Sequence, residues 1–342
     1  MLHLISRIVS LLLIFISVVL FSSIGTLAVL MYSNTAPQSS QEAEDEIAFE
    51  VYSGESARSV GRRLEEAGLI RTRYFWYLLC QFDVNFIKAG SYRIPVPINQ
   101  TDLHSLLIRG QQTLTKVTIP EGYTLKKTAR IMAESGICSE QDFLNAASNP
   151  DILAKYSIPA STMEGYLYPD TYLFPLSFSA VRVVDTMAQT FFSRLDDFPQ
   201  AQSLSAEDLY QKVTVASIVE REYRAPQEAA VMAGVFYNRL DTGMALQSCA
   251  TVEYIITEIQ GRPHPERLFD RDIEIQDDYN TYTNKGLPPG PIASPGTVAL
   301  NAAFNPDENN YLYFRLIEPS SGRHYFSRTF DEHIQAGILY VK

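Results

Sequence analysis

Cysteine and histidine are scarce in this chain, and neither stands at the spacings that metal sites use. The 342 residues include three cysteines and five histidines. Cys80, Cys138 and Cys249 match no zinc-ligand pattern, and there is no HExxH motif or close histidine pair. We therefore expect no metal and no cofactor. We also expect three small buried thiols, with a Cys80–Cys138 disulfide as the alternative.

Positive charge is also in short supply. The chain has 28 Lys and Arg against 39 Asp and Glu, a formal net charge of -11. A general nucleic-acid binder carries a basic surface, so this class of function is excluded and no nucleic-acid partner is expected. With 46% apolar and 20% charged residues, the composition is that of a folded protein long enough for two domains.

Charge is missing altogether from residues 8–31, a run of 24 residues. A helix needs ~20 apolar residues to cross a bilayer. Arg7 precedes the run, and no Lys or Arg follows it until Arg58. We therefore expect a single-pass anchor in the cytoplasmic (inner) membrane, with residues 1–7 in the cytoplasm and the remainder outside. A cleaved signal peptide is the alternative. The polar residues 32–46 are expected to form a linker.

Residues 47–116 are predicted to form a small α/β module. A strand over residues 47–51 is followed by a helix that Ser56 caps, a second helix over 74–80, a strand over 89–94 and a helix capped by Thr101. This order resembles the LysM-like modules found beside cell-wall enzymes. A spacer that binds nothing is the alternative.

Residues 117–342 are predicted to form a larger α+β domain, in which polar motifs become dense from about residue 162. Long helices are expected over 181–195, 209–223 and 228–241, with a short helix over 301–305. Residues 311–317 and 324–327 are expected to pair as a hairpin. The fold class is therefore α+β.

Glu220 is the candidate catalytic residue. It ends the apolar run Val213–Val219, and Ala216 and Ser217, one turn earlier, leave room for a ligand. A carboxyl group on a buried helix resists ionisation, because its charged form loses water, and a neutral carboxylic acid can act as a proton donor near pH 7. Glu222 should point away from this face of the helix. The alternative is a helix-ending carboxylate paired with an arginine.

Three other segments supply polar groups that could hold a sugar. They lie at 164–174, 246–252 and 279–284, and the candidate substrate-binding residues are Glu164, Gln247, Ser248, Thr251, Asn280 and Tyr282. Each is also an ordinary loop residue. Residues 286–296 hold four prolines and three glycines in eleven positions, which predicts a rigid wall or brace.

Several motifs, in order, resemble the endolytic murein transglycosylases, the MltG/YceG-like family. They are EGYLYPDTY (164–172), ASIVE (216–220), FYNRL (236–240), LQS (246–248), YNTY (279–282), GLPPGPI (286–292) and GRHYFS (322–327). The resemblance implies a membrane-anchored enzyme, with a LysM-like subdomain, that cuts nascent peptidoglycan strands between MurNAc and GlcNAc and leaves 1,6-anhydro-MurNAc ends, thereby terminating elongation. The family's essential glutamate falls on Glu220, and cell-wall synthases are candidate partners. Cys249-Ala250 stands where the family commonly has Asp-Pro.

A single acid suffices for this reaction if the substrate supplies its own nucleophile. A hydrolytic muramidase is the first alternative; it would need a second carboxylate, for which Glu164 and Asp170 are the candidates. The second alternative is a non-catalytic glycan-binding anchor that recruits cell-wall synthases.

Overall fold

A computed structural model of the protein describes residues 12–26, 29, 45–52, 54–83, 86–110 and 114–340. The predicted cytoplasmic segment, residues 1–7, and most of the linker lie outside these residues. Of the predicted membrane segment 8–31, residues 12–26 form a helix with exposed apolar side chains. Among the described residues, no helix combines the length and the apolar character that crossing a membrane requires.

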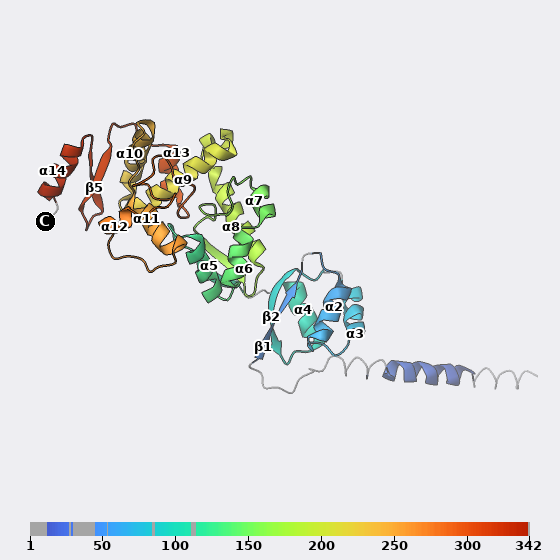
Figure 1. The fold of residues 1–342 in the computed structure, drawn as a ribbon. Coiled ribbons are helices and arrows are strands. Elements are labelled where there is room, and N and C mark those ends of the chain that lie inside the picture. The colour runs from blue at the N-terminus through green and yellow to red at the C-terminus, as the bar shows by residue number, and fades with distance from the viewer. Residues whose placement is uncertain are drawn as a thin grey trace, which may run out of the picture. The chain divides into compact units, whose positions relative to one another are not determined.

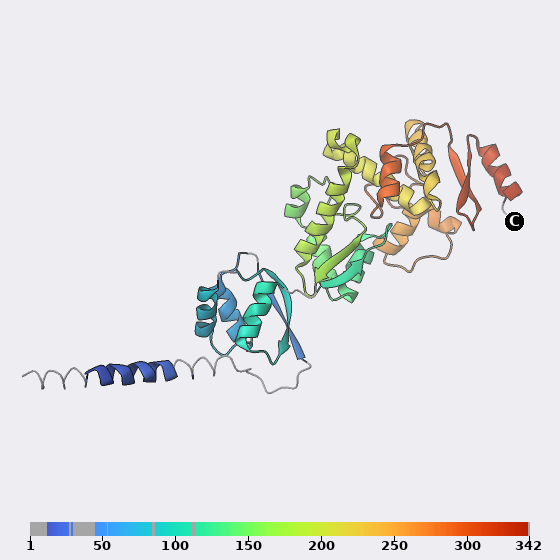
Figure 2. The ribbon, with the colours of Figure 1, turned by 180° about the vertical axis from the view of Figure 1, so that it is seen from behind.

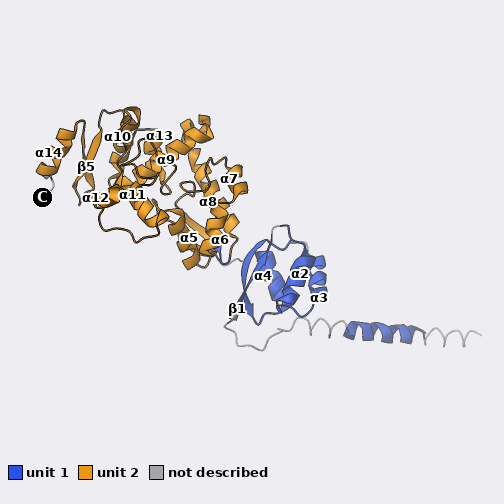
Figure 3. Cartoon of the chain, viewed as in Figure 1, with its two compact units in different colours: residues 1–114, 175–177 blue, residues 115–174, 178–342 orange. Residues whose placement is uncertain are grey.

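The chain divides into two compact units (Figure 3). Unit 1 comprises residues 1–114 and 175–177, and unit 2 comprises residues 115–174 and 178–342. The elements of unit 1 are β1 (Asp45–Val51), α2 (Ala57–Glu66), α3 (Arg73–Phe82), β2 (Gly90–Val96) and α4 (Gln100–Arg109).

The part of unit 1 from residue 45 onward is a two-stranded antiparallel sheet with three helices. β1 and β2 pair so that Phe49 lies opposite Tyr92. The core of the unit includes Trp76, whose indole N–H is donated to the carbonyl of Ala57 at 3.0 Å. Ser56 caps α2, as predicted. The cap of α4 is Asn99 rather than Thr101, because the Asn99 side chain reaches the backbone N–H of Asp102.

Unit 2 is mostly helical, with two small sheets, so the α+β class is confirmed at this level (Figures 1 and 2). Its elements are β3 (Leu114–Thr118), α5 (Leu125–Glu134), α6 (Glu140–Ala147), α7 (Pro150–Lys155), β4 (Thr171–Pro175), α8 (Ala180–Leu195), η1 (Pro199–Ser203), α9 (Ala206–Glu222), η2 (Pro226–Glu228), α10 (Ala229–Asp241), α11 (Cys249–Tyr254), η3 (Ile255–Ile259), α12 (Asp270–Ile273), α13 (Thr297–Phe304), β5 (Tyr313–Glu318), β6 (Arg323–Ser327) and α14 (Phe330–Tyr340).

Helix α9 is the centre of unit 2. It packs against α13 and α10, and every residue from Val213 to Val219 is buried. β3 pairs with β4, and β5 with β6, the predicted hairpin. Helix α14 packs on this hairpin, next to the C-terminus (Figure 1). The short helix predicted at 301–305 is α13, which begins earlier, at Thr297.

The three cysteines are free. Cys80 and Cys138 are partly buried, and burial raises the pKa of each thiol to about 11. Cys249 is exposed, which corrects the expectation that all three are buried. The reason is its position at the first turn of α11, beside a cavity.

Candidate active site

Glu220 lies in the last turn of α9, at the point where the helix leaves the core. Ser205 caps the other end of the helix by accepting the N–H of Asp208, and acidic residues in the first turn complement the helix dipole. The buried apolar run 213–219 fixes the helix in unit 2, so the Glu220 side chain is held at the edge of the core and is only partly buried.

The Glu220 carboxyl group is held by neutral donors and not by a cation. Its Oε2 accepts the backbone N–H of Gly296 at 2.9 Å, and the Tyr223 hydroxyl lies 3.4 Å from Oε1. Arg221 directs its guanidinium to Glu253 instead, at 3.0 Å. Burial raises the pKa of Glu220 to about 7, and the neighbouring Glu121 acts in the same direction. The group can therefore give up and take back a proton near neutral pH.

Glu121 is a residue of this site that sequence reasoning missed. Its carboxylate lies against the α-carbon of Gly296; a Cβ added there would be 1.9 Å from Glu121 Oε1. Gly296 therefore has to be a glycine for both glutamates to approach it. The sequence marks Glu121 only as part of a turn that follows a strand, because Gly122 comes next. In the structure Gly122 has a φ of +74°. That segment is distant from Glu220 in the sequence, so only folding reveals the pair.

The proline- and glycine-rich loop 286–296 is tied to both α9 and the Glu121 turn. Ser217, buried on α9, accepts the N–H of Ile292 at 3.0 Å. The N–H of Gly122 is donated to the carbonyl of Ser294 at 2.9 Å, and the N–H of Ser294 to the carbonyl of Tyr123 at 2.8 Å. These bonds hold the loop as a wall beside Glu220.

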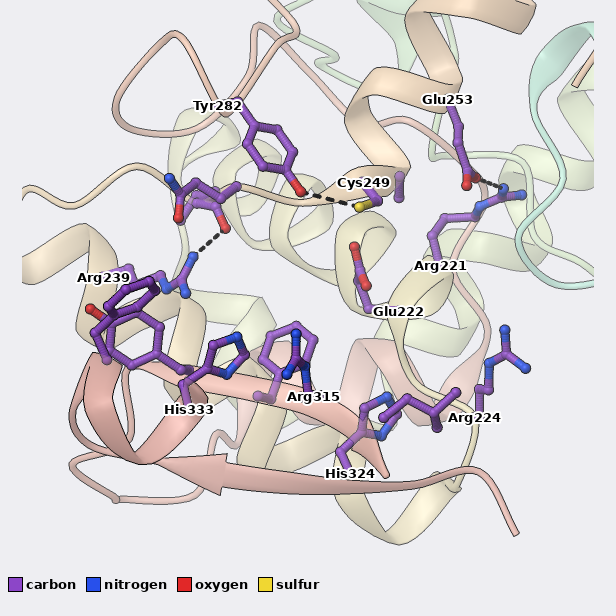
Figure 4. Close-up of a pocket in the computed structure, with 17 residues that line it drawn as sticks. Arg221, Glu222, Arg224, Arg239, Cys249, Glu253, Tyr282, Arg315, His324 and His333 are labelled. Carbon is purple, nitrogen blue, oxygen red and sulfur yellow. Dashed lines mark hydrogen bonds and ion pairs between the residues drawn. The ribbon is translucent and has the colours of Figure 1, made fainter. Parts of the chain in front are cut away.

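A cavity of about 510 Å³ lies near the end of α9 (Figure 4). Glu222 lines it, together with Gln247, Cys249 and Tyr282, and its carboxylate points into the space. Glu220 is not among the residues that line it. The Ser248 hydroxyl is donated to Glu222. Burial raises the pKa of Glu222, against the opposing effect of Ser248.

Three of the six candidate sugar-binding residues lie near Glu222: Gln247 and Tyr282 line the same cavity, and Ser248 donates to the Glu222 carboxylate. Glu222 thus points away from Glu220, as expected, but it lies next to residues that were expected at the Glu220 site. The physical reason is that α11 and the 279–284 segment pack beside the far face of the last turn of α9. Gln247 has a φ of +50° and an exposed side chain, and its N–H is donated to the carbonyl of Thr281 at 3.0 Å. The Tyr282 hydroxyl lies 3.1 Å from Cys249 Sγ.

Asn280 and Thr251 are 0% exposed and are occupied by internal hydrogen bonds. The Asn280 amide donates to the carbonyls of Ile273 and Ile275, and its oxygen accepts the N–H of Tyr282. The Thr251 hydroxyl is donated to the Ser248 carbonyl at 2.8 Å. In this conformation both residues shape the loops and offer no atom to a ligand.

The two other carboxylates considered for the site lie elsewhere. Glu164 is 8% exposed, and both its oxygens lie 3.1 Å from the N–H of Leu125, at the start of α5. Burial raises the pKa of Glu164 to about 8. Asp170 forms an ion pair with Arg194 at 3.5 Å and accepts the N–H of Thr171. Both carboxylates therefore support local structure. Among the described residues, no cluster of side chains is suited to hold a metal ion.

Comparison with known families places most of the chain in one family. The profile of the YceG-like family matches residues 49–337. The chain belongs to the YceG-like family. A crystal structure of a yceG-like protein from Listeria monocytogenes is 30% identical in sequence and superposes with a TM-score of 0.56, over 85% of this chain and 99% of that one.

Two relatives of this YceG-like chain carry a functional name. A Streptococcus pneumoniae protein named endolytic murein transglycosylase is 28% identical over 307 residues, 82% of this chain and 56% of the relative. A Bacillus subtilis protein of the same name is 27% identical over 318 residues, 88% of this chain and 86% of the relative. This chain thus spans about half the length of the pneumococcal relative.

Proposed function

We propose that this protein is an endolytic murein transglycosylase that cuts peptidoglycan strands between MurNAc and GlcNAc. The observation that carries the proposal is the state of the Glu220 carboxyl group. Its pKa is raised to about 7, it forms no ion pair with any described residue, and it is held against a rigid loop. Support comes from the family and from relatives that bear this name.

In the proposed reaction, Glu220 donates its proton to the glycosidic oxygen as the bond from C1 of MurNAc to that oxygen breaks. The N-acetyl carbonyl of MurNAc stabilises the positive charge that develops at C1. The C6 hydroxyl then attacks C1, and the Glu220 carboxylate takes its proton, which closes the 1,6-anhydro ring and restores the enzyme. Ring closure is intramolecular, so holding the sugar in the reactive geometry supplies a large part of the rate.

Hydrolysis is the second candidate reaction. The observation that favours it is the position of the Glu121 carboxylate beside Glu220. A muramidase needs a second carboxylate to orient water or to form a covalent intermediate. Glu121 meets Glu220 at Gly296, whereas Glu164 and Asp170 serve local structure. The two reactions give different products, because a hydrolysed end is heavier than an anhydro end by the mass of one water.

The test is digestion of nascent glycan by the full chain in detergent, with mass spectrometry of the new ends. We expect anhydro ends from the wild type and a loss of about 10²–10⁴-fold in rate for Glu220→Gln, which keeps the shape but cannot cycle a proton. Glu207→Gln, an exposed position on the same helix, is the control. Full activity in Glu220→Gln would remove Glu220 from the mechanism. The absence of new glycan ends from the wild type would instead favour a non-catalytic glycan-binding anchor.

We also propose that the segment 8–31 anchors the protein in the cytoplasmic membrane, with the residues after it outside, and that residues 47–116 form a LysM-like glycan-binding module. The uncharged run and the absence of Lys and Arg from residues 32–57 support this orientation. Protease treatment of intact spheroplasts tests it. Protection of both units from the protease would contradict the orientation, and failure of isolated glycan strands to bind unit 1 would favour a spacer.

A further inference from the structure

The cavity beside the end of α9 is rich in positive charge, although the chain as a whole is acidic. Four arginines and two histidines from five elements and the segment after α9 line it: Arg221, Arg224, Arg239, Arg315, His324 and His333. Only two carboxylates, Glu222 and Glu253, line the same space. In a chain with a formal net charge of -11, a concentration of four arginines marks a place where an anion is stabilised.

Some of these side chains already have partners within the protein. Arg221 pairs with Glu253 at 3.0 Å, and His324 with Glu228 at 2.9 Å. Arg239 donates to backbone carbonyls, including those of Leu312 and Leu246. The guanidinium of Arg239 is therefore committed to the fold.

Arg224 and Arg315 differ from the others, because neither forms an ion pair with any residue that the structure describes. The Arg315 guanidinium lies directly against Gly337 of α14; a Cβ at that glycine would be 1.5 Å from its Nη1. Helix α14 also brings His333, whose Nδ1 is buried without a hydrogen-bond partner among the described residues. Figure 4 shows Arg315, His333 and Glu222 around the same space.

The remaining walls of the cavity suit a ligand with a flat or apolar body beside its charge. Tyr282, Tyr313 and Phe330 line it, and Arg239 lies over the Tyr313 ring at 5.3 Å. Glu222 repels a bound anion less than an exposed carboxylate would, because burial raises the pKa of Glu222 and favours its neutral form. The cavity therefore fits an anionic group on a larger organic molecule.

The cavity begins next to the proposed catalytic acid. Arg221 follows Glu220 in the chain, lines the cavity and donates to the carbonyl of Gly122 at 3.3 Å. A Cβ at Gly122 would be 3.6 Å from Glu220 Cγ and 3.5 Å from Arg221 Cδ. Arg221 thus connects the turn that carries Gly122, beside Glu220, with the cavity.

We propose that this cavity binds a carboxylate of the stem peptide that peptidoglycan carries on each MurNAc, with Arg224 and Arg315 as the charge-bearing contacts. The inference rests on the proposed function and names a second subsite of the same substrate. A lipid-linked diphosphate is the other anion of a nascent strand. It occurs once, at the strand end, whereas a stem peptide adjoins every bond that an internal cut can break, so the carboxylate is favoured.

The experiment measures binding by calorimetry to the full-length Glu220→Gln protein in detergent. The substitution is used because it prevents turnover of the probe. The probes are a GlcNAc–MurNAc peptide with free carboxylates, the same compound with its carboxylates converted to amides, and inorganic pyrophosphate. We expect the free carboxylate form to bind about ten-fold more tightly than the amide form, as a charge-assisted bond predicts. Adding Arg315→Gln or Arg224→Gln should remove that difference and leave the binding of the amide form unchanged.

Arg323→Gln is the matched control, because Arg323 is an exposed arginine on the same hairpin that does not line the cavity. Equal binding of the two muropeptides would overturn the proposal, and so would pyrophosphate binding more tightly than the free muropeptide. Failure of the proposed function would give a different result. The wild type would then release no new glycan ends in the cleavage assay, whereas the calorimetric preference for the free carboxylate form would remain.

Discussion

The carboxyl groups of Glu121 and Glu220 meet at Gly296. Glu220 accepts the N–H of this glycine at 2.9 Å, and Glu121 Oε1 occupies the space that a side chain at position 296 would need. The negative charge of Glu121 thus raises the pKa of Glu220, in addition to the effect of burial. This arrangement keeps Glu220 protonated at a pH at which an exposed carboxyl group has lost its proton.

The first prediction concerns the pH dependence of glycan cleavage. The acid form of Glu220 is needed for the first step, so kcat/KM should fall as pH rises through about 7. Replacing Glu121 by Gln removes the neighbouring negative charge, and the descending limb should move to lower pH. The check is kcat/KM against pH for both proteins. A limb that does not move in Glu121→Gln would show that Glu121 has no electrostatic effect on the acid.

The second prediction is that Gly296→Ala impairs catalysis by displacing Glu121. The new methyl group would lie 1.9 Å from Glu121 Oε1, so the carboxylate must move and the Gly296 N–H shifts relative to Glu220. We expect a loss of about 10-fold or more in kcat/KM, because small misplacements at a reacting centre are costly. In the background Glu121→Ala, which makes room, the same substitution should cost much less. Equal costs in both backgrounds would contradict the steric explanation.

The third prediction distinguishes stability from catalysis at Asn280. Asn280→Ala removes two donated hydrogen bonds and the acceptor for the N–H of Tyr282. We expect the free energy of unfolding to fall by about 2–4 kcal/mol, because buried backbone groups lose their partners. Urea unfolding gives this value. A stable variant with a selective loss of substrate binding would instead show that Asn280 contacts the sugar.

The fourth prediction is a pH-dependent effect of Glu164→Gln on stability. The pKa of Glu164 is about 8 in the folded protein, against about 4.5 for a glutamate exposed to water, so the folded protein retains a proton that the unfolded chain releases. Its contribution to stability is present at low pH and is lost as pH rises from about 4.5 to 8. Glutamine does not ionise, so the variant should gain a few kcal/mol relative to wild type across this window.

The Glu164→Gln comparison is made by urea unfolding at pH 5 and pH 8.5, with Glu207→Gln as an exposed control whose difference from wild type should stay flat. A difference for Glu164→Gln that does not grow with pH would mean that the carboxyl group ionises normally in the folded protein.

Much of the fold follows from local patterns in the sequence. The apolar run 213–219 marks α9 as a buried helix ending in Glu220, and Ser56, Ser139 and Gly110 mark helix ends because caps and left-handed glycines act within a few residues. Thr101 shows where such signals become ambiguous, since Asn99, two residues earlier, competes for the same N–H groups.

What the sequence determined by itself is therefore which segments become helices and strands, and that a carboxyl group stands at the end of a buried helix. The tertiary structure alone decided the neighbours of that carboxyl group: Glu121 and Gly296 on one side, and the cationic cavity of Arg315 and His333 on the other. The reason is that helical periodicity assigns a residue to a face, whereas the segment that covers this face is selected by packing between residues far apart in the chain.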